Sequence, residues 1–304
     1  MSSTSTTRGV HDLLRSAPPP PTAAADGSAA GWSAGRTLPL RVELVRQWRR
    51  RRTQLVLAGL ALFPLVLAAL FARNREGVVT GGTRFVDLAT GGAVNFALFV
   101  VFASSTLLIV VVVALFCGDT VASEAGWSSL KYLLASPVSR SRLLRQKLVV
   151  SFGLALTGLV ILPVSALISG GIFFGFGPAR TPLGSVIPTG EALFRLSIVI
   201  GYLAVSMLFV ASLAFFLGVH TDAPLGAVGG AVMLVIISTI LDQVEDLGPV
   251  REILPTHYIG AWVDAFNDPV VWQDMGRGAV LSVAYAAVLL ALAWRKFLRK
   301  DVLS

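Results

Sequence analysis

The sequence predicts an all-α integral membrane protein with six transmembrane helices. The composition, the spacing of the apolar runs and the placement of positive charge support this prediction. Of the 304 residues, 55% are hydrophobic and only 14% are charged, whereas about 25% of the residues in a soluble domain are charged. The net charge of +8 lies mostly beside apolar runs, which favours anionic lipid over nucleic acid as its partner.

Six apolar runs are long enough to cross a bilayer, which takes about 20 residues. They lie at roughly 54–72, 96–117, 148–174, 194–218, 225–241 and 278–294. The segments on one side of these runs carry more than two thirds of the 25 Lys and Arg residues, which predicts that this side is cytoplasmic. We therefore expect a multi-pass protein of the cytoplasmic (inner) membrane, with both termini and the loop 118–147 in the cytoplasm.

The interiors of the six runs contain no Asp, Glu, Lys or Arg. Charges within a membrane mark ion and proton pathways, so their absence disfavours a pump driven by an ion gradient. The polar residues in the runs are hydroxyls: Ser104, Ser105, Thr106, Ser165, Ser206, Ser238, Thr239 and Tyr285. We interpret them as helix-to-helix hydrogen-bonding groups, with substrate contact as the alternative.

Two different segments precede the first run. Residues 1–38 are rich in Ser, Thr, Pro, Ala and Gly, which predicts a disordered cytoplasmic tail. In residues 39–53 apolar residues alternate with arginines, which predicts a short helix in the headgroup region or, compatibly, a signal that holds the start of span one in the cytoplasm. The expected interfacial anchors are Trp48, Arg49, Arg50, Arg51 and Arg52.

The loop 118–147 is a polar island between the second and third runs. Its two acids are followed by apolar residues at helical spacing, which predicts a short amphipathic helix. Pro137 ends this helix, and basic residues lead into the third run. Such a helix either docks on a soluble partner or packs on its own bundle. The candidate docking residues are Asp119, Glu124, Trp127, Leu130, Leu133, Leu134, Arg140 and Lys147.

This island carries a resemblance to a known family. The acidic start, the run Leu133-Leu134-Ala135, the run Ser136-Pro137-Val138-Ser139-Arg140 and the basic Lys147 together resemble the permease subunits of type-2 ATP-binding-cassette exporters. In that family the loop between spans two and three contacts a separate ATPase subunit. The resemblance implies a coupling helix within 118–147, an elbow helix at 39–53 and a permease domain at 54–300.

Within the coupling helix, Trp127, Leu130 and Leu134 would be the apolar anchors. Asp119 and Glu124 would pair with basic groups, either Arg140 and Lys147 of this chain or residues of the partner.

The resemblance implies that the chain is the transmembrane subunit of an exporter. Two cytoplasmic ATPase subunits would bind ATP and Mg, so no cofactor is expected on this chain. A second permease copy or a paralogue would complete a cavity for an amphipathic or lipid-like substrate. The alternative is a nontransporting membrane scaffold or sensor that recruits a soluble partner through the loop.

The sequence lacks the common catalytic motifs, which disfavours an enzyme. The sequence has no GxxxxGK[ST] phosphate-binding loop, no HExxH and no GxSxG, which removes the usual signals for an ATPase, a metalloprotease and a serine hydrolase. The outer segment 242–276 is rich in acids, but their spacing matches no named metal site, and we expect a solvated acidic rim.

The outer segment 242–276 also holds apolar residues broken by three prolines, which predicts two short helices. By resemblance these would be re-entrant and cap the translocation path, and the alternative is a surface hairpin.

Overall fold

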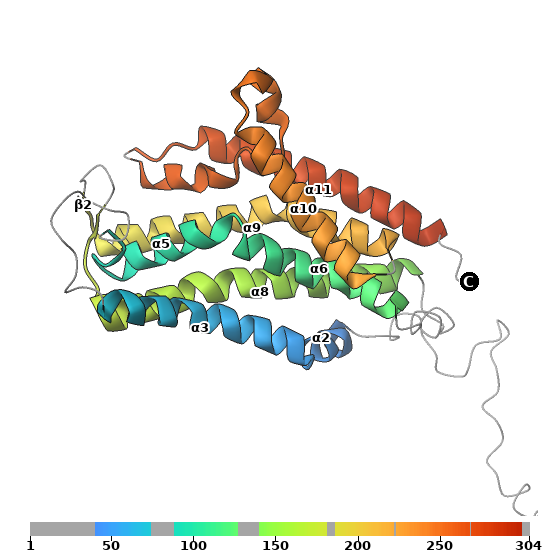
Figure 1. Ribbon diagram of the computed structural model, residues 1–304, viewed down its shortest axis with the longest axis horizontal. Coiled ribbons are helices and arrows are strands. Elements are labelled where there is room, and N and C mark those ends of the chain that lie inside the picture. Colours follow the sequence, from blue (N-terminus) through green and yellow to red (C-terminus); the bar gives the residue numbers. More distant parts are fainter. Residues whose placement is uncertain are drawn as a thin grey trace, which may run out of the picture. The chain divides into compact units, whose positions relative to one another are not determined.

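The structure is a computed structural model that describes residues 40–73, 88–126, 140–180, 186–221, 223–267 and 269–299. Helices dominate these ranges (Figure 1). The elements, with η for 3-10 helices, are α2 (Leu40–Trp48), α3 (Arg51–Arg73), α5 (Ala93–Ser105), α6 (Leu108–Gly126), α8 (Arg140–Phe174), β1 (Ala179–Arg180), β2 (Val186–Ile187), α9 (Thr189–His220), α10 (Pro224–Asp242), η2 (Glu245–Ile253), η3 (Ile259–Phe266) and α11 (Gln273–Arg299). The predicted tail, residues 1–38, lies outside the described residues.

The helices are those of an all-α, multi-pass membrane protein. Five of them, α3, α8, α9, α10 and α11, are long and apolar enough to cross a bilayer, and the bent pair α5 and α6 raises the number to six if it counts as one span. Within the described ranges the only sheet found is the antiparallel pair β1 and β2, two residues each. The predicted all-α fold class is therefore confirmed.

The second apolar run, predicted as one segment at 96–117, is broken in the structure. α5 and α6 meet at an angle of 60°, at Thr106 and Leu107. The Ser105 hydroxyl donates to the carbonyl of Phe102 at 3.1 Å, and serine bonds of this kind bend helices. The bend gives this run two directions, which a hydropathy pattern does not reveal.

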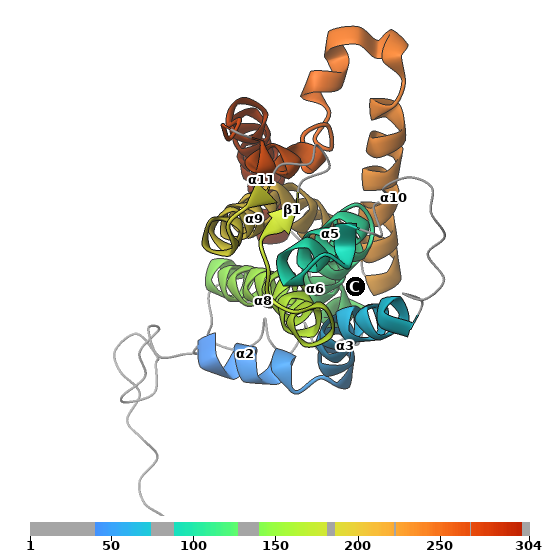
Figure 2. The same cartoon turned by 90° about the vertical axis from the view of Figure 1, so that its left-hand side faces the viewer.

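α9 is the centre of the bundle. Two thirds of its most apolar stretch is buried, against about a fifth for α3 and α11, because α6, α8, α10 and α11 all pack on it. In the end-on view α3, α8, α9 and α11 are stacked, while α10 runs alongside the stack (Figure 2). The outer faces of α10 and α11 remain apolar and exposed, as expected where lipid replaces a protein neighbour.

Glycines bring the middle of α6 into close contact with the C-terminal end of α9. A Cβ atom on Gly218 would collide with the backbone carbonyl of Gly118, and one on Gly118 would press on the Ala214 carbonyl and on Val228 of α10. Small residues allow this backbone approach. The contact fixes the C-terminal part of α6, which carries Asp119.

Segment 242–276 contains two short helices, as predicted, but η2 and η3 are 3-10 helices. Gly248 has a φ of 51° inside η2, in the left-handed region that glycine tolerates best. The segment is tied to α10 by His257 Nδ1, 2.5 Å from the Asp242 carboxylate. Arg251 lies 3.8 Å from the same carboxylate.

The structure corrects in part the interpretation of the hydroxyl groups as helix-to-helix hydrogen-bonding groups. Instead of linking helices, the hydroxyls of Ser105 and Thr239 donate to carbonyls of their own helix, and those of Ser104 and Ser206 are buried with no hydrogen-bond partner among the described residues. Other hydroxyls do link separate elements. The cross-element pairs include Ser165 with the Leu60 carbonyl, Ser238 with Thr256 and Tyr285 with the Ile253 carbonyl.

Candidate functional site

α2 buries two polar side chains against the bundle and exposes its apolar side chains. Glu43 and Gln47, four residues apart and therefore on one face of the helix, are both buried. The exposed apolar residues of α2 are Leu40, Val42, Leu44, Val45 and Trp48. The contacts of Glu43 and Gln47 therefore attach α2 to its neighbours.

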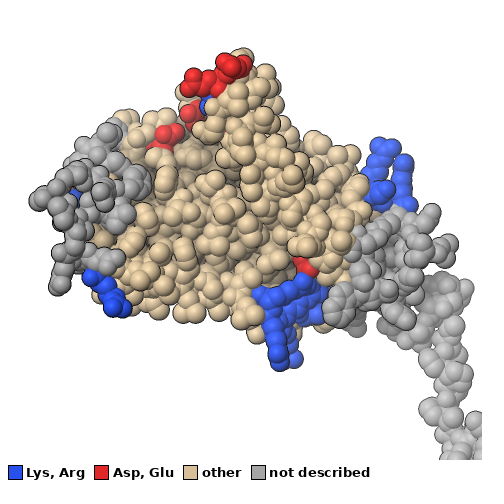
Figure 3. Space-filling view, viewed as in Figure 1, with Lys and Arg blue, Asp and Glu red and all other residues tan. Residues whose placement is uncertain are grey.

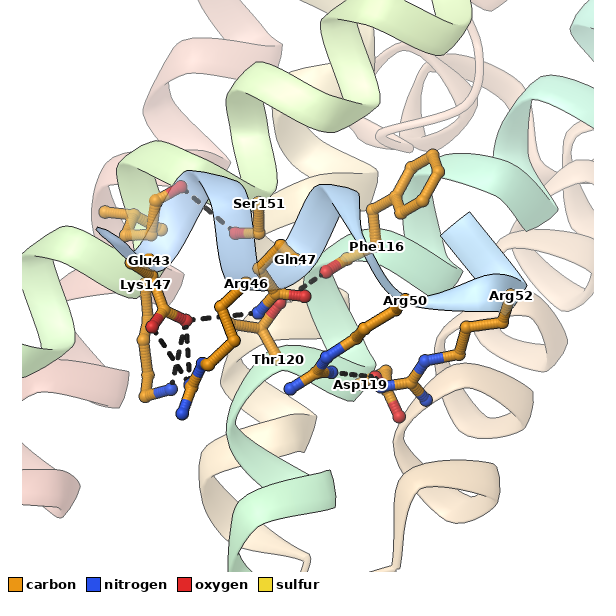
Figure 4. Close-up of polar contacts among 11 residues, drawn as sticks. Glu43, Arg46, Gln47, Arg50, Arg52, Phe116, Asp119, Thr120, Lys147 and Ser151 are labelled. Atoms are coloured by element: carbon orange, nitrogen blue, oxygen red, sulfur yellow. Dashed lines mark hydrogen bonds and ion pairs between the residues drawn. The ribbon is translucent and has the colours of Figure 1, made fainter. Parts of the chain in front are cut away.

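The Glu43 carboxylate is the centre of the first polar contact, between α2 and α8 (Figure 4). Arg46 Nη2 lies 2.9 Å from Oε2, and Gln47 donates its amide N–H to Oε1 at 3.2 Å. Lys147 Nζ, on α8, lies 3.5 Å from Oε1, and both members of this pair are almost fully buried. A lysine buried this deeply requires a negative charge nearby, and Glu43 supplies it.

Opposing effects determine the pKa of Glu43. Burial raises the pKa of the carboxyl, but the Lys147 and Arg46 cations and the Gln47 hydrogen bond together outweigh burial and hold the pKa below its ordinary value of about 4.5. Glu43 is therefore an anion at neutral pH. The contact with Lys147 is a buried ion pair.

The Asp119 carboxylate is the centre of the second contact, between α6 and the start of α3. Arg50, in the turn between α2 and α3, places Nη1 3.4 Å from Oδ2, and Arg52 contacts the same oxygen. Asp119 is buried, whereas the Arg52 side chain is 44% exposed. Two cations thus reach from the surface to a buried acid (Figure 4).

The structure corrects the predicted partners of these charges. Asp119 pairs with Arg50 and Arg52, which were not among its predicted partners, and Lys147 pairs with Glu43. Residues 50 and 52 reach α6 from the α2–α3 turn and the start of α3, and the predicted contact with Arg140 lies outside the described residues. Arg50 and Arg52 bind this carboxylate of the protein, and their predicted role as lipid anchors stays a prediction.

Other predicted site residues have different outcomes. Trp48, Arg49 and Arg51 are exposed, which leaves their predicted anchoring role as a prediction. Glu124 is on α6 and Arg140 on α8, and their side chains lie outside the described residues. The predicted docking helix residues Trp127, Leu130, Leu133 and Leu134 also lie outside the described residues.

Sequence reasoning missed Glu43 and Gln47. One signal was available: Glu43 is the only acid between residues 38 and 52, in a segment with six arginines, and it lies one helical turn from Gln47. An isolated acid in a basic segment is more informative than the arginines around it.

The two carboxylate contacts flank the predicted docking helix. Asp119 lies seven residues before the end of α6 at Gly126, and Lys147 lies seven residues after the start of α8 at Arg140. The elements on both sides of residues 127–139 are thus bound to the α2–α3 segment. Because removing one member of a buried ion pair costs about 3–5 kcal/mol, a movement of α8 at this end must carry α2 along or break the Glu43–Lys147 pair.

The charged side chains of this site attach helices to one another. Each carboxylate already accepts contacts from two cations. Across the described ranges, no three His, Cys, Asp or Glu side chains gather as they would around a metal ion. The arrangement holds α2 to α8 and α3 to α6 by charge.

The family comparison covers most of this chain. Residues 60–303 match a family described as "Protein of unknown function (DUF2705)", so the match begins within α3 and excludes α2. No curated protein matches the chain.

Proposed function

The chain belongs to the DUF2705 family, and on this premise we propose that it is the transmembrane subunit of an ATP-binding-cassette exporter. The chain couples ATP hydrolysis by two separate cytoplasmic ATPase subunits to export of an amphipathic or lipid-like substrate. A second permease copy or a paralogue completes the transport path. ATP and Mg bind to the ATPase.

One observation carries this proposal: the two carboxylate contacts on either side of residues 127–139. A coupling loop transmits force only if the helices that continue from it move together with their surroundings. Glu43–Lys147 joins α8 to α2, and Asp119 joins α6 to Arg50 and Arg52. A push on the loop from an ATPase would therefore tilt α6, α8 and α2 as one unit.

The topology of the proposal follows from length and charge. The bent pair α5 and α6 counts as one span, which makes six spans, and α2 is the elbow helix. The α2 end is cytoplasmic, as are both chain termini, in the inner membrane. In support, Lys and Arg gather at the start of α3 and at the C-terminal end of α11, with a smaller patch at the far end of α3, whereas Asp and Glu gather on η2 (Figure 3).

The segment 242–276 lies on the outer side in this topology. η2 and η3 cap the path there, and the apolar side chains of η3 favour partial immersion in the outer leaflet: its hydrophobic residues include the buried Trp262 and the half-exposed Val263. A surface hairpin without a gating role is the alternative.

The test is co-purification of the full chain with the ATPase encoded next to its gene. Leu130→Arg with Leu134→Arg places two charges on the predicted docking face, and we expect the ATPase to be lost while the permease elutes normally. Val186→Arg is the matched control, because Val186 is exposed on β2, away from the docking loop, and should leave binding unchanged.

The same experiment separates the alternatives. Unchanged ATPase binding by the double variant would reject the coupling assignment. Binding that depends on Leu130 and Leu134, but with an ATPase rate insensitive to the permease and no substrate movement in vesicles, would support the scaffold function instead.

A further inference from the structure

A second feature, a half-open apolar pocket of about 270 Å³, lies far from the charge contacts. It is formed where α5, β1 and η3 meet, and β1 lies beside α5 (Figure 2). The described lining residues are Leu88, Ala89, Asn95, Leu98, Phe99, Phe102, Arg180, Trp262, Val263 and Phe266. The pocket is thus apolar except at one corner.

That polar corner is built by Asn95 and Arg180. The Asn95 side chain donates to the Arg180 carbonyl at 2.7 Å and accepts from the Arg180 backbone N–H at 3.0 Å. These two bonds use the Asn95 amide and fix the backbone of β1 on α5. The Arg180 side chain remains exposed, and it is the only charged one among the described lining residues.

The opposite wall is held in place before any ligand arrives. Arg195 donates to the carbonyls of Ala265, at 3.4 Å, and Asn267, at 2.8 Å, which fixes the end of η3 on α9. Trp262 is buried, and its ring lies 6.4 Å from that of Phe102 in an edge-to-face arrangement. A preformed pocket binds without the cost of ordering its walls.

The size of the pocket limits its occupant. A cavity of about 150 Å³ holds one benzene molecule, so 270 Å³ takes a longer apolar group. Asn95 and Phe102 are seven residues apart on α5, about 10 Å at 1.5 Å per residue. The pocket therefore extends over about a third of a 30 Å hydrocarbon core. This length suits a medium alkyl chain, and the volume of about 270 Å³ is too small for the two chains of a phospholipid.

We propose that this pocket binds a free fatty acid. The carboxylate binds Arg180, and the single chain runs along Phe99, Phe102 and Trp262. A guanidinium recognises a carboxylate by charge-assisted hydrogen bonds, and the apolar walls exclude a second polar group. This site is separate from the docking loop and does not rest on the exporter proposal.

The experiment uses the full chain in nanodiscs of zwitterionic phosphatidylcholine, without an ATPase. A decanoic acid that carries a photoreactive diazirine near its tail is crosslinked, and the labelled peptides are identified by mass spectrometry. We expect labels on α5 and η3, with competition by decanoate. The variant Arg180→Gln should weaken decanoate competition roughly tenfold or more and leave competition by the neutral decanol unchanged, because only the charged contact is lost.

Two further variants test the pocket itself. Val263→Trp fills the space and should weaken competition by both decanoate and decanol. Arg277→Gln removes an exposed arginine from α11 that lines a different pocket, and it should change neither.

Three outcomes would overturn the proposal. Labels spread evenly over the lipid-facing sides of α10 and α11 would indicate ordinary partition into the bilayer. Equal effects of Arg180→Gln and Arg277→Gln would indicate general surface charge. Crosslinks from a photoreactive residue at position 263 to a second copy of the chain would show that the pocket is a protein interface.

Discussion

The two ends of the bundle hold their peripheral segments by different chemistry. At the α2 end, charged side chains bind each other: Glu43 with Lys147, and Asp119 with Arg50. Segment 242–276 is held in part by the Asp242 contacts with His257 and Arg251. In addition, side chains donate to its backbone carbonyls, as Tyr202 does to Tyr258 at 2.5 Å. Arg195 and Tyr285 act in the same way.

This difference has a physical consequence. Every residue offers a carbonyl, so the bonds of Tyr202, Tyr285 and Arg195 to segment 242–276 depend little on its sequence. An ion pair exists only while both side chains are present and charged. The α2 end, which is held by ion pairs, should therefore respond strongly to single substitutions, pH and salt. Segment 242–276, where backbone bonds add to the Asp242 contacts, should respond more to overpacking.

The largest effect is expected from Glu43→Gln. This variant removes the negative charge that faces the buried Lys147, and breaking such a pair should lower the free energy of unfolding by about 3–5 kcal/mol. Denaturation of the purified protein in mixed micelles measures this loss. The double variant Glu43→Leu with Lys147→Met should recover most of it, because an apolar pair of similar volume often replaces a buried ion pair without loss. A loss below about 1 kcal/mol for the single variant would show that the pair does not hold α2.

Overpacking at one glycine should be enough to loosen segment 242–276. A Cβ atom on Gly278 would collide with the Tyr202 hydroxyl and with the Tyr258 side chain, so Gly278→Ala should cost about 1–3 kcal/mol by overpacking. We expect faster amide exchange in η2 and η3. Gly276→Ala, on the same helix with open space around the added atom, is the control and should stay within about 0.5 kcal/mol of wild type. Equal exchange rates in the two variants would contradict the close contact.

The pH dependence distinguishes the two ends. The pKa of Glu43 is lower in the folded protein than its ordinary value of about 4.5, so its stabilising contribution is present above about pH 4.5 and is lost as the pH falls through the folded pKa. The stability difference between wild type and Glu43→Gln should shrink on acidification from pH 7 toward pH 3. The difference between wild type and Gly278→Ala should stay nearly constant. A stability difference between wild type and Glu43→Gln that stays constant with pH would show that the Glu43–Lys147 ion pair does not stabilise the α2 end.

The smallest effect is expected from Arg52→Gln. The Arg52 side chain is 44% exposed, and an exposed ion pair contributes only about 0–1 kcal/mol. Arg50 still faces Asp119 in this variant, which limits the loss further. Unfolding at low and at high salt measures the effect, which should vanish at high salt. A loss as large as that of Glu43→Gln would mean that Asp119, and not Glu43, is the main link at the α2 end.

The apolar runs of the sequence predict most of the helices. Runs at 148–174 and 194–218 correspond to the longer α8 and α9, because about 20 apolar residues have no other stable conformation in lipid. The bend between α5 and α6 was not predicted, since hydropathy gives length and not direction. In the candidate site, Asp119 and Lys147 were predicted as docking residues of the loop, whereas the structure buries both in helices and pairs them with Arg50, Arg52 and Glu43.

The sequence by itself determined that the chain crosses a membrane, because hydropathy and local charge act over a single helix. Only the tertiary structure decided which charges meet. Glu43 and Lys147 are 104 residues apart, and Arg50 and Asp119 are 69 apart. Their contact depends on how α2 lies across α6 and α8, which is set by packing between helices. The fatty-acid pocket likewise exists only because Arg195 holds η3 over α5, a placement that no local pattern contains.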